Sequence, residues 1–177
     1  MYPDLHQSEL REPAPGPAGP GALSRVAARA RRRAVRAGDA EVDTGHLLHA
    51  LLESDDRALV IAAPEQAQST RLMGYLVQRS IGFGREWRSG EGAGLHRAQE
   101  RAVVRWSRSA GDALERASRS ARIRVGEEAD ALDLLAQLAA DPSCRASEIM
   151  RGAGVDLGAV VARVHGAVVP QQGRRGA

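Results

Sequence analysis

Lysine and asparagine are absent from this sequence of 177 residues, and cysteine occurs once, at Cys144. Without lysine the chain has no phosphate-binding loop of the Walker A type, and it cannot form the Schiff base of pyridoxal phosphate chemistry. A single cysteine excludes an internal disulfide framework and a zinc site built from several cysteines. All 25 basic residues are therefore arginine, as GC-rich coding favours, so the pI of 9.9 does not by itself point to nucleic acid.

Aromatic residues and long apolar runs are also scarce. Aromatics make up 3% of the chain, and no apolar run approaches the roughly 20 residues that a membrane-spanning helix needs. The first ten residues lack the apolar centre of a secretory signal. The remaining balance, 43% hydrophobic and 27% charged residues with a net charge of +3, is that of a globular domain. We expect a cytoplasmic protein without a membrane segment.

Proline and glycine mark the boundaries of the folded part. Residues 1–21 alternate proline and glycine with small residues, and such a stretch buries too little surface to offset its ordering entropy. The sequence predicts a disordered arm there, a glycine-rich linker over 83–96 and a flexible tail over 169–177. One domain is expected over 22–168.

Apolar residues inside this domain recur with helical spacing. A first helix is predicted from Leu23 to Gly38, where the glycine offers a stop. Thr44 is a plausible N-cap for a second, leucine-rich helix. The apolar stretch of 58–82 is interrupted by Pro64 and predicts one or two further helices. A second helical block is expected from about Arg97 to Val169. No segment shows strand alternation, so the prediction is all-α.

The two halves of the helical region are similar to each other. At one constant offset Ala30 pairs with Ala117, Asp43 pairs with Asp130, and the leucines of the two leucine-rich segments coincide. We predict two pseudo-symmetric four-helix repeats, repeat one over 22–82 and repeat two over 97–168, packed as one bundle. A chance match between Ala- and Leu-rich helices is the alternative interpretation.

The first repeat carries a recognisable motif. Ala30, Ala34 and Gly38 precede the block Thr44-Gly45-His46-Leu47-Leu48, and the second repeat ends in Gly154-Val155-Asp156-Leu157. This arrangement resembles the Clp N-terminal domain, the double-repeat helical module of Clp-family AAA+ unfoldases. The resemblance extends over about 22–168 and implies a stand-alone protein without the AAA+ ATPase module.

The resemblance implies a non-catalytic protein- or peptide-binding module of the Clp protease system. The expected partners are a Clp ATPase, its substrates or its adaptors, with cyclic peptides as further candidate ligands. Such a module recognises substrates or adaptors, modulates the ATPase, or acts as a decoy for ligands of its N-domain. Gly45 and Leu132 stand where the family has glutamates that help receive phosphoarginine, so we expect no preference for phosphoarginine over arginine.

The same alignment with the Clp N-terminal domain motif implies a set of candidate partner-binding residues. Trp106 stands where the family often has an aromatic residue in a hydrophobic binding spot, although an ordinary core position is the alternative. The family's Thr-Glu-His positions correspond to residues at the start of each leucine-rich helix. The predicted partner-binding set is Trp106, Thr44, Gly45, His46, Leu132 and Asp133.

Arginines gather on the first predicted helix. They could neutralise phosphates, which makes a small nucleic-acid-binding regulator the alternative function, or they could dock an acidic partner. No aromatic residues alternate with them, so a solvated face is the simpler interpretation and nucleic acid is not the expected partner. The arginines of this face are Arg25, Arg29, Arg32, Arg33 and Arg36.

Metal binding and catalysis have little support in the sequence. His46 and His49 are three residues apart, but no third ligand has matching spacing. His46 stands at the histidine position of the Clp N-terminal domains it resembles, which implies a structural hydrogen bond near the helix start. Cys144 follows an Asp-Pro-Ser turn at a predicted helix start, where we expect a silent thiol. No nucleophile motif is present. We expect no enzyme, no cofactor and no metal.

Overall fold

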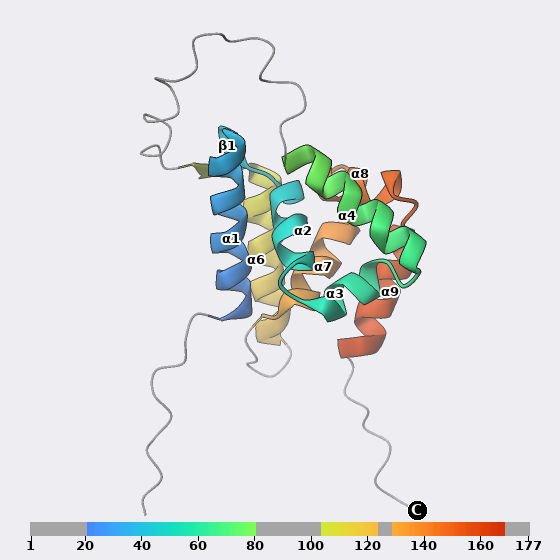
Figure 1. Cartoon of the computed structure of the whole chain (residues 1–177). Helices are drawn as coiled ribbons and strands as arrows, with labels where there is room; N and C mark the ends of the chain where they lie inside the picture. The colour runs from blue at the N-terminus through green and yellow to red at the C-terminus, as the bar shows by residue number, and fades with distance from the viewer. Residues whose placement is uncertain (1–20, 81–103, 124–128, 169–177) are drawn as a thin grey trace, which may run out of the picture.

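The computed structural model describes residues 21–80, 104–123 and 129–168, and within them the all-α prediction is confirmed (Figure 1). None of the described helices is long and apolar enough to cross a membrane. The predicted arm, linker and tail lie outside the described residues, apart from Gly21. The elements are α1 (Ala22–Ala37), β1 (Glu41–Val42), α2 (Thr44–Leu52), α3 (Asp56–Ala62), α4 (Gln66–Ser80), β2 (Arg105–Trp106), α6 (Arg108–Ile123), α7 (Ala131–Ala140), α8 (Arg145–Gly152) and α9 (Leu157–Val168).

The two leucine-rich helices, α2 and α7, form the centre of the bundle. They contact each other, while α1 packs on α2, α6 packs on α7, and α8 and α9 contact both their own half and the other. In Figure 1 they lie between α1 and the group formed by α3, α4, α8 and α9. Each fully buried leucine contributes about 2 kcal/mol. The six leucines that the repeat predicted to be buried are all inaccessible to solvent, namely Leu47, Leu48, Leu51, Leu134, Leu135 and Leu138.

Helix α1 buries a narrow stripe of small residues and ends where the sequence predicted. Val26, Ala30 and Ala34 face the core at a spacing of four residues, which lets α1 approach α2 closely. Gly38 follows the helix with φ of 67°, a left-handed conformation that costs glycine little. Its backbone N–H donates to carbonyls of the last turn, which ends the helix.

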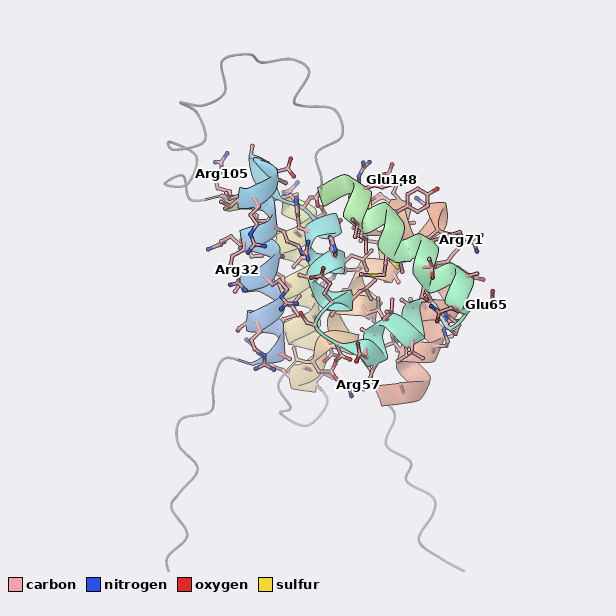
Figure 2. All side chains as sticks on the ribbon, in the orientation of Figure 1. Arg32, Arg57, Glu65, Arg71, Arg105 and Glu148 are labelled. Carbon is pink, nitrogen blue, oxygen red and sulfur yellow. The ribbon has the colours of Figure 1, made fainter. Side chains whose placement is uncertain are left out.

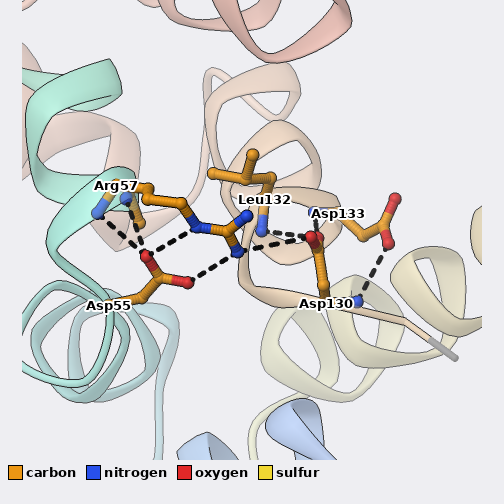
Figure 3. A network of polar contacts seen from close by, with 6 residues as sticks. Asp55, Arg57, Asp130, Leu132 and Asp133 are labelled. Atoms are coloured by element: carbon orange, nitrogen blue, oxygen red, sulfur yellow. Dashed lines mark hydrogen bonds and ion pairs between the residues drawn. The ribbon is translucent and has the colours of Figure 1, made fainter. Parts of the chain in front are cut away.

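Helices α2 and α7 begin with the same capping arrangement. Asp43, not Thr44, is the N-cap of α2, so the predicted cap was wrong by one position. The Asp43 carboxylate accepts from the His46 N–H at 3.0 Å, and His46 Nδ1 accepts from the Asp43 N–H at 3.1 Å. At α7, Asp130 and Asp133 exchange equivalent bonds of 3.1 and 3.0 Å (Figure 3). These caps occupy matching places in the two predicted repeats, and the equivalence of the complete halves stays a prediction.

The stretch after α8 explains the Gly-Val-Asp-Leu motif. Gly154 has φ of 81°, which favours glycine. The Asp156 carboxylate then accepts from the Ala159 N–H at 3.1 Å and so caps the start of α9. The motif therefore combines a left-handed turn with a helix cap. In the first half Pro64 separates α3 from α4, in agreement with the predicted break.

A short parallel strand pair joins the two halves, where the sequence showed no strand alternation. Glu41 pairs with Arg105 and Val42 pairs with Trp106, and the Ser107 N–H donates to the Val42 carbonyl at 3.0 Å. Two residues per strand are too few to produce a visible alternation in the sequence. The pairing brings Trp106 next to the end of α1.

Candidate partner-binding groove

An open groove of about 730 Å³ lies along the outer face of α1 and against Trp106 of β2. The buried stripe of α1 faces the core, and the groove uses residues from other positions around the same helix. Trp106 is partly buried, packs against the hydrophobic core and lines the groove as well. The sequence left two interpretations of Trp106, a core residue or an accessible aromatic. Each is true of one part of the side chain, because one part packs on the core and another lines the groove. The apolar lining is Ala27, Ala28, Val35 and Trp106.

The position of Trp106 follows from the strand pair. Val42 is fully buried and fixes β1 close to the end of α1, and the parallel register places Trp106 beside Val42. The Arg31 guanidinium carbon lies 5.3 Å from the centre of the Trp106 ring. A guanidinium at this distance is attracted to the ring face by about 0.5–1 kcal/mol at an exposed site. Arg31 and Trp106 therefore form a cation–π pair at the groove.

The arginines of α1 fall into two sets. Arg33 makes a close ion pair with Glu53 at the end of α2, and Arg29 lies 3.7 Å from the same carboxylate. Arg25 is exposed in the first turn and does not line the groove. In Figure 2 the labelled Arg32 points away from the bundle. The arginines that line the groove are Arg31, Arg32 and Arg36.

Glu53 belongs to a partly buried charge cluster between α1 and α2. Burial raises the pKa of the Glu53 carboxyl, but the hydrogen bond and charge of Arg33, with the charges of His49 and Arg29, bring the pKa below its usual range. His49 Nε2 lies 3.1 Å from Glu53 Oε1. Burial and then the charge of Arg33 lower the pKa of the His49 imidazole. This cluster holds α1 on α2 and uses Arg29 and Arg33 for structure.

Five of the six predicted partner-binding residues are buried in this structure. The Thr44 hydroxyl accepts a hydrogen bond from the Ala146 N–H, and His46 and Asp133 serve in the caps described above. They belong to α2 and α7, the central helices, which contact several neighbouring helices. Of the six residues, Trp106 is the one that is partly exposed. The five buried residues are Thr44, Gly45, His46, Leu132 and Asp133.

His46 has the structural role that the sequence predicted. Its Nδ1 accepts from the Asp43 N–H, so the tautomer consistent with this network carries a proton on Nε2, which lies 3.0 Å from the Asp39 carboxylate. Both ring nitrogens are therefore engaged, and His49 faces Glu53 instead. Within the described residues no three His, Cys, Asp or Glu side chains gather as a metal site.

Cys144 lies at the start of α8, as expected, but its side chain is buried. The thiol donates to the Leu138 carbonyl, with a sulfur–oxygen distance of 3.4 Å, and the Ser147 hydroxyl donates to the same carbonyl at 2.8 Å. Both side chains are buried. Both side chains fasten α8 to α7.

Sequence reasoning missed two residues that define the groove and its surroundings. Arg31 was left out of the predicted arginine face, although it lies in the same run of arginines. Glu53 follows His49 by four residues, a spacing that predicts a pair on one helix face. The apolar groove residues also left a signal, because Ala27 and Val35 lie off the buried stripe of α1.

No protein-family model matches this sequence, and no curated protein is similar enough to count as a match. The function must therefore be inferred from the groove and from the residues that build it.

Proposed function

We propose that this chain is a non-catalytic protein- or peptide-binding module whose partner binds the groove between α1 and Trp106. The carrying observation is the position of Trp106, which packs on the core with one part and lines the open groove with another. Partly exposed tryptophans of this kind supply much of the binding energy at protein interfaces, because they bury a large area and lose little side-chain entropy.

The partner class comes from the resemblance of the Thr44–Leu48 block to Clp N-terminal domains. We infer a Clp ATPase, its substrates or its adaptors as partners, and a cytoplasmic location accordingly. A free module of this type competes for N-domain ligands or delivers them, depending on its copy number and affinity. Cyclic peptides that bind such domains are candidates for the same groove.

Binding to the purified Clp ATPase of the same host, and to its adaptors, tests this proposal. Trp106→Ala should weaken binding by about 2 kcal/mol, close to thirtyfold, if Trp106 is the anchor. Tyr75→Ala is the matched control, since Tyr75 is an aromatic residue on α4 that is 48% exposed and does not line the groove. Unchanged affinity with a lower free energy of unfolding for Trp106→Ala would assign the ring to packing alone and contradict the proposal.

Salt dependence separates this proposal from nucleic-acid binding by α1. Groove binding through Trp106 should persist at about 0.5 M salt, whereas binding through several phosphate contacts falls by orders of magnitude. The ion pairs of Arg29 and Arg33 with Glu53 favour the protein-binding proposal, because they withdraw two arginines from any phosphate-binding face. A steep loss of binding with salt, unaffected by Trp106→Ala, would favour nucleic acid.

A further inference from the structure

The groove has a one-sided charge. Arg31, Arg32 and Arg36 line it, and none of its lining residues is acidic. The part of the chain that the structure describes offers these three side chains no ion pair, whereas Arg29 and Arg33 of the same helix meet Glu53. The helical spacing thus separates arginines that hold the fold from arginines that face the groove.

One of these charges lies over the Trp106 ring. The Arg31 guanidinium carbon is 5.3 Å from the ring centre. A guanidinium in a cation–π contact keeps N–H groups that can bind a carboxylate with two parallel hydrogen bonds. Arg31 is exposed, so a ligand in the groove reaches these N–H groups.

The groove also offers apolar surface between the charges. Ala27 and Ala28 expose only short side chains, and Val35 and Trp106 supply larger apolar surface along the same helix face. A large apolar side chain of a ligand fits against this lining, with its neighbouring residues close to the arginines. One aromatic ring among three arginines is a poor platform for successive stacked bases, which single-stranded nucleic acids use.

The geometry points to a specific occupant of the groove, namely a segment of a partner protein that carries aspartate or glutamate beside a large apolar residue. The apolar residue packs against Trp106, Ala27 and Ala28, and the carboxylates pair with Arg31 and Arg36. This inference rests on the proposed function, because it names the chemistry of the partner for the same groove. Charge complementarity then steers the acidic segment to α1 and sets its specificity.

Selection from a displayed library of short random peptides tests the inference on the full chain. Peptides that bind the protein but not Trp106→Ala should be enriched in aspartate and glutamate next to large apolar residues. The best synthetic peptide should bind Arg31→Glu/Arg36→Glu at least about tenfold more weakly. Arg122→Glu, a reversal on the exposed end of α6, is the matched control and should leave affinity unchanged. Circular dichroism establishes that each variant is folded, and Arg31→Gln repeats the test without introducing a negative charge.

Selection on the reversed variant provides a second, independent readout. Its enriched peptides should carry lysine and arginine in place of the acids. Trp106-dependent peptides without an acidic excess would overturn the inference and leave the proposed function standing. No Trp106-dependent enrichment would contradict both. Displacement of the peptide by single-stranded DNA, with a steep salt dependence, would assign the arginines to nucleic acid and overturn the inference as well.

Discussion

The hydroxyl of Thr44 accepts a hydrogen bond from the backbone N–H of Ala146 at 3.0 Å, although the two residues are 102 positions apart in the sequence. Thr44 is the first residue of α2 and is 1% exposed, and Ala146 lies in the first turn of α8. The N-cap of α8, Cys144, makes no side-chain capping bond. Thr44 therefore supplies from another helix the acceptor that the start of α8 needs.

Two substitutions of Thr44 should distinguish the contribution of its hydroxyl to stability from that of its methyl group. Thr44→Val keeps the shape but leaves the Ala146 N–H buried without an acceptor, which costs about 1–3 kcal/mol. Thr44→Ser keeps the acceptor and loses one methyl group, at about 1 kcal/mol. Amide hydrogen exchange at Ala146 distinguishes them, because only the valine variant should speed it. Equal exchange in both variants would show that the hydroxyl does not protect this amide.

The cap of α7 predicts a second pair of variants. Asp133 accepts from the Asp130 N–H at 3.0 Å and is 2% exposed. Asp133→Asn retains an acceptor oxygen, whereas Asp133→Ala removes it and should lower the free energy of unfolding by about 1 kcal/mol more. Urea denaturation of the two variants measures the difference. Identical midpoints and slopes would contradict a capping role for this carboxylate.

The cluster of His49 and Glu53 predicts two steps of acid destabilisation. Burial and the charge of Arg33 lower the pKa of His49 below its ordinary value of 6.5, so the unfolded chain takes up the proton first and stability falls as pH drops below 6.5. Burial raises the pKa of Glu53, but the Arg33 hydrogen bond and the charges of Arg33, His49 and Arg29 together lower it below 4.5. Its stabilising contribution is present above pH 4.5 and is lost as pH falls further.

Denaturation midpoints measured between pH 7 and pH 3 test both steps. The informative range for each group is about one pH unit from its ordinary pKa, where the loss of stability begins. His49→Gln should flatten the upper step and leave the lower one. Arg33→Gln should weaken the lower step, because Glu53 then loses its closest positive charge. An unchanged upper step in His49→Gln would assign it to another group.

Arg57 connects α3 with the start of α7, as Figure 3 shows. Its guanidinium lies 3.1 Å from Asp55 and 3.6 Å from Asp130, but the side chain is 65% exposed. Arg57→Ala should therefore cost less than about 1 kcal/mol and even less at high salt. Asp55→Ala should cost about 1 kcal/mol at either salt concentration, since Asp55 also caps α3 by accepting from the backbone at 2.9 Å. A cost for Arg57→Ala that is large and independent of salt would contradict this ranking.

Local signals in the sequence predicted most of the described fold. Gly38 and Pro64 marked helix ends through their backbone preferences, and the leucines marked the two buried helices through their spacing. The N-cap of α2 was misplaced because Asp43 and Thr44 are both good capping residues, and composition alone does not choose between neighbours. The helix existed where it was expected, and only its first residue differed.

The site was less predictable, because it depends on contacts between distant segments. Nothing local to Trp106 indicates that it pairs with Val42 or that the Arg31 guanidinium lies over its ring. Likewise, nothing local to Thr44 indicates that its hydroxyl accepts a hydrogen bond from α8. The charge pair of His49 and Glu53 was readable from spacing, whereas the approach of Arg33 to Glu53 required the packing of α1 on α2.

The groove is built from two stretches of chain that the β1–β2 pair brings together. Residues of α1 form one wall and Trp106 comes from the other half, so neither half carries the site by itself. A ligand in the groove therefore binds only the joined form and, by mass action, opposes separation of the halves. Occupancy should slow amide exchange at Ser107, whose N–H holds the two strands together. A bound partner thus stabilises the β1–β2 pairing that joins the two halves. The free energy of that pairing in turn limits the affinity for the partner.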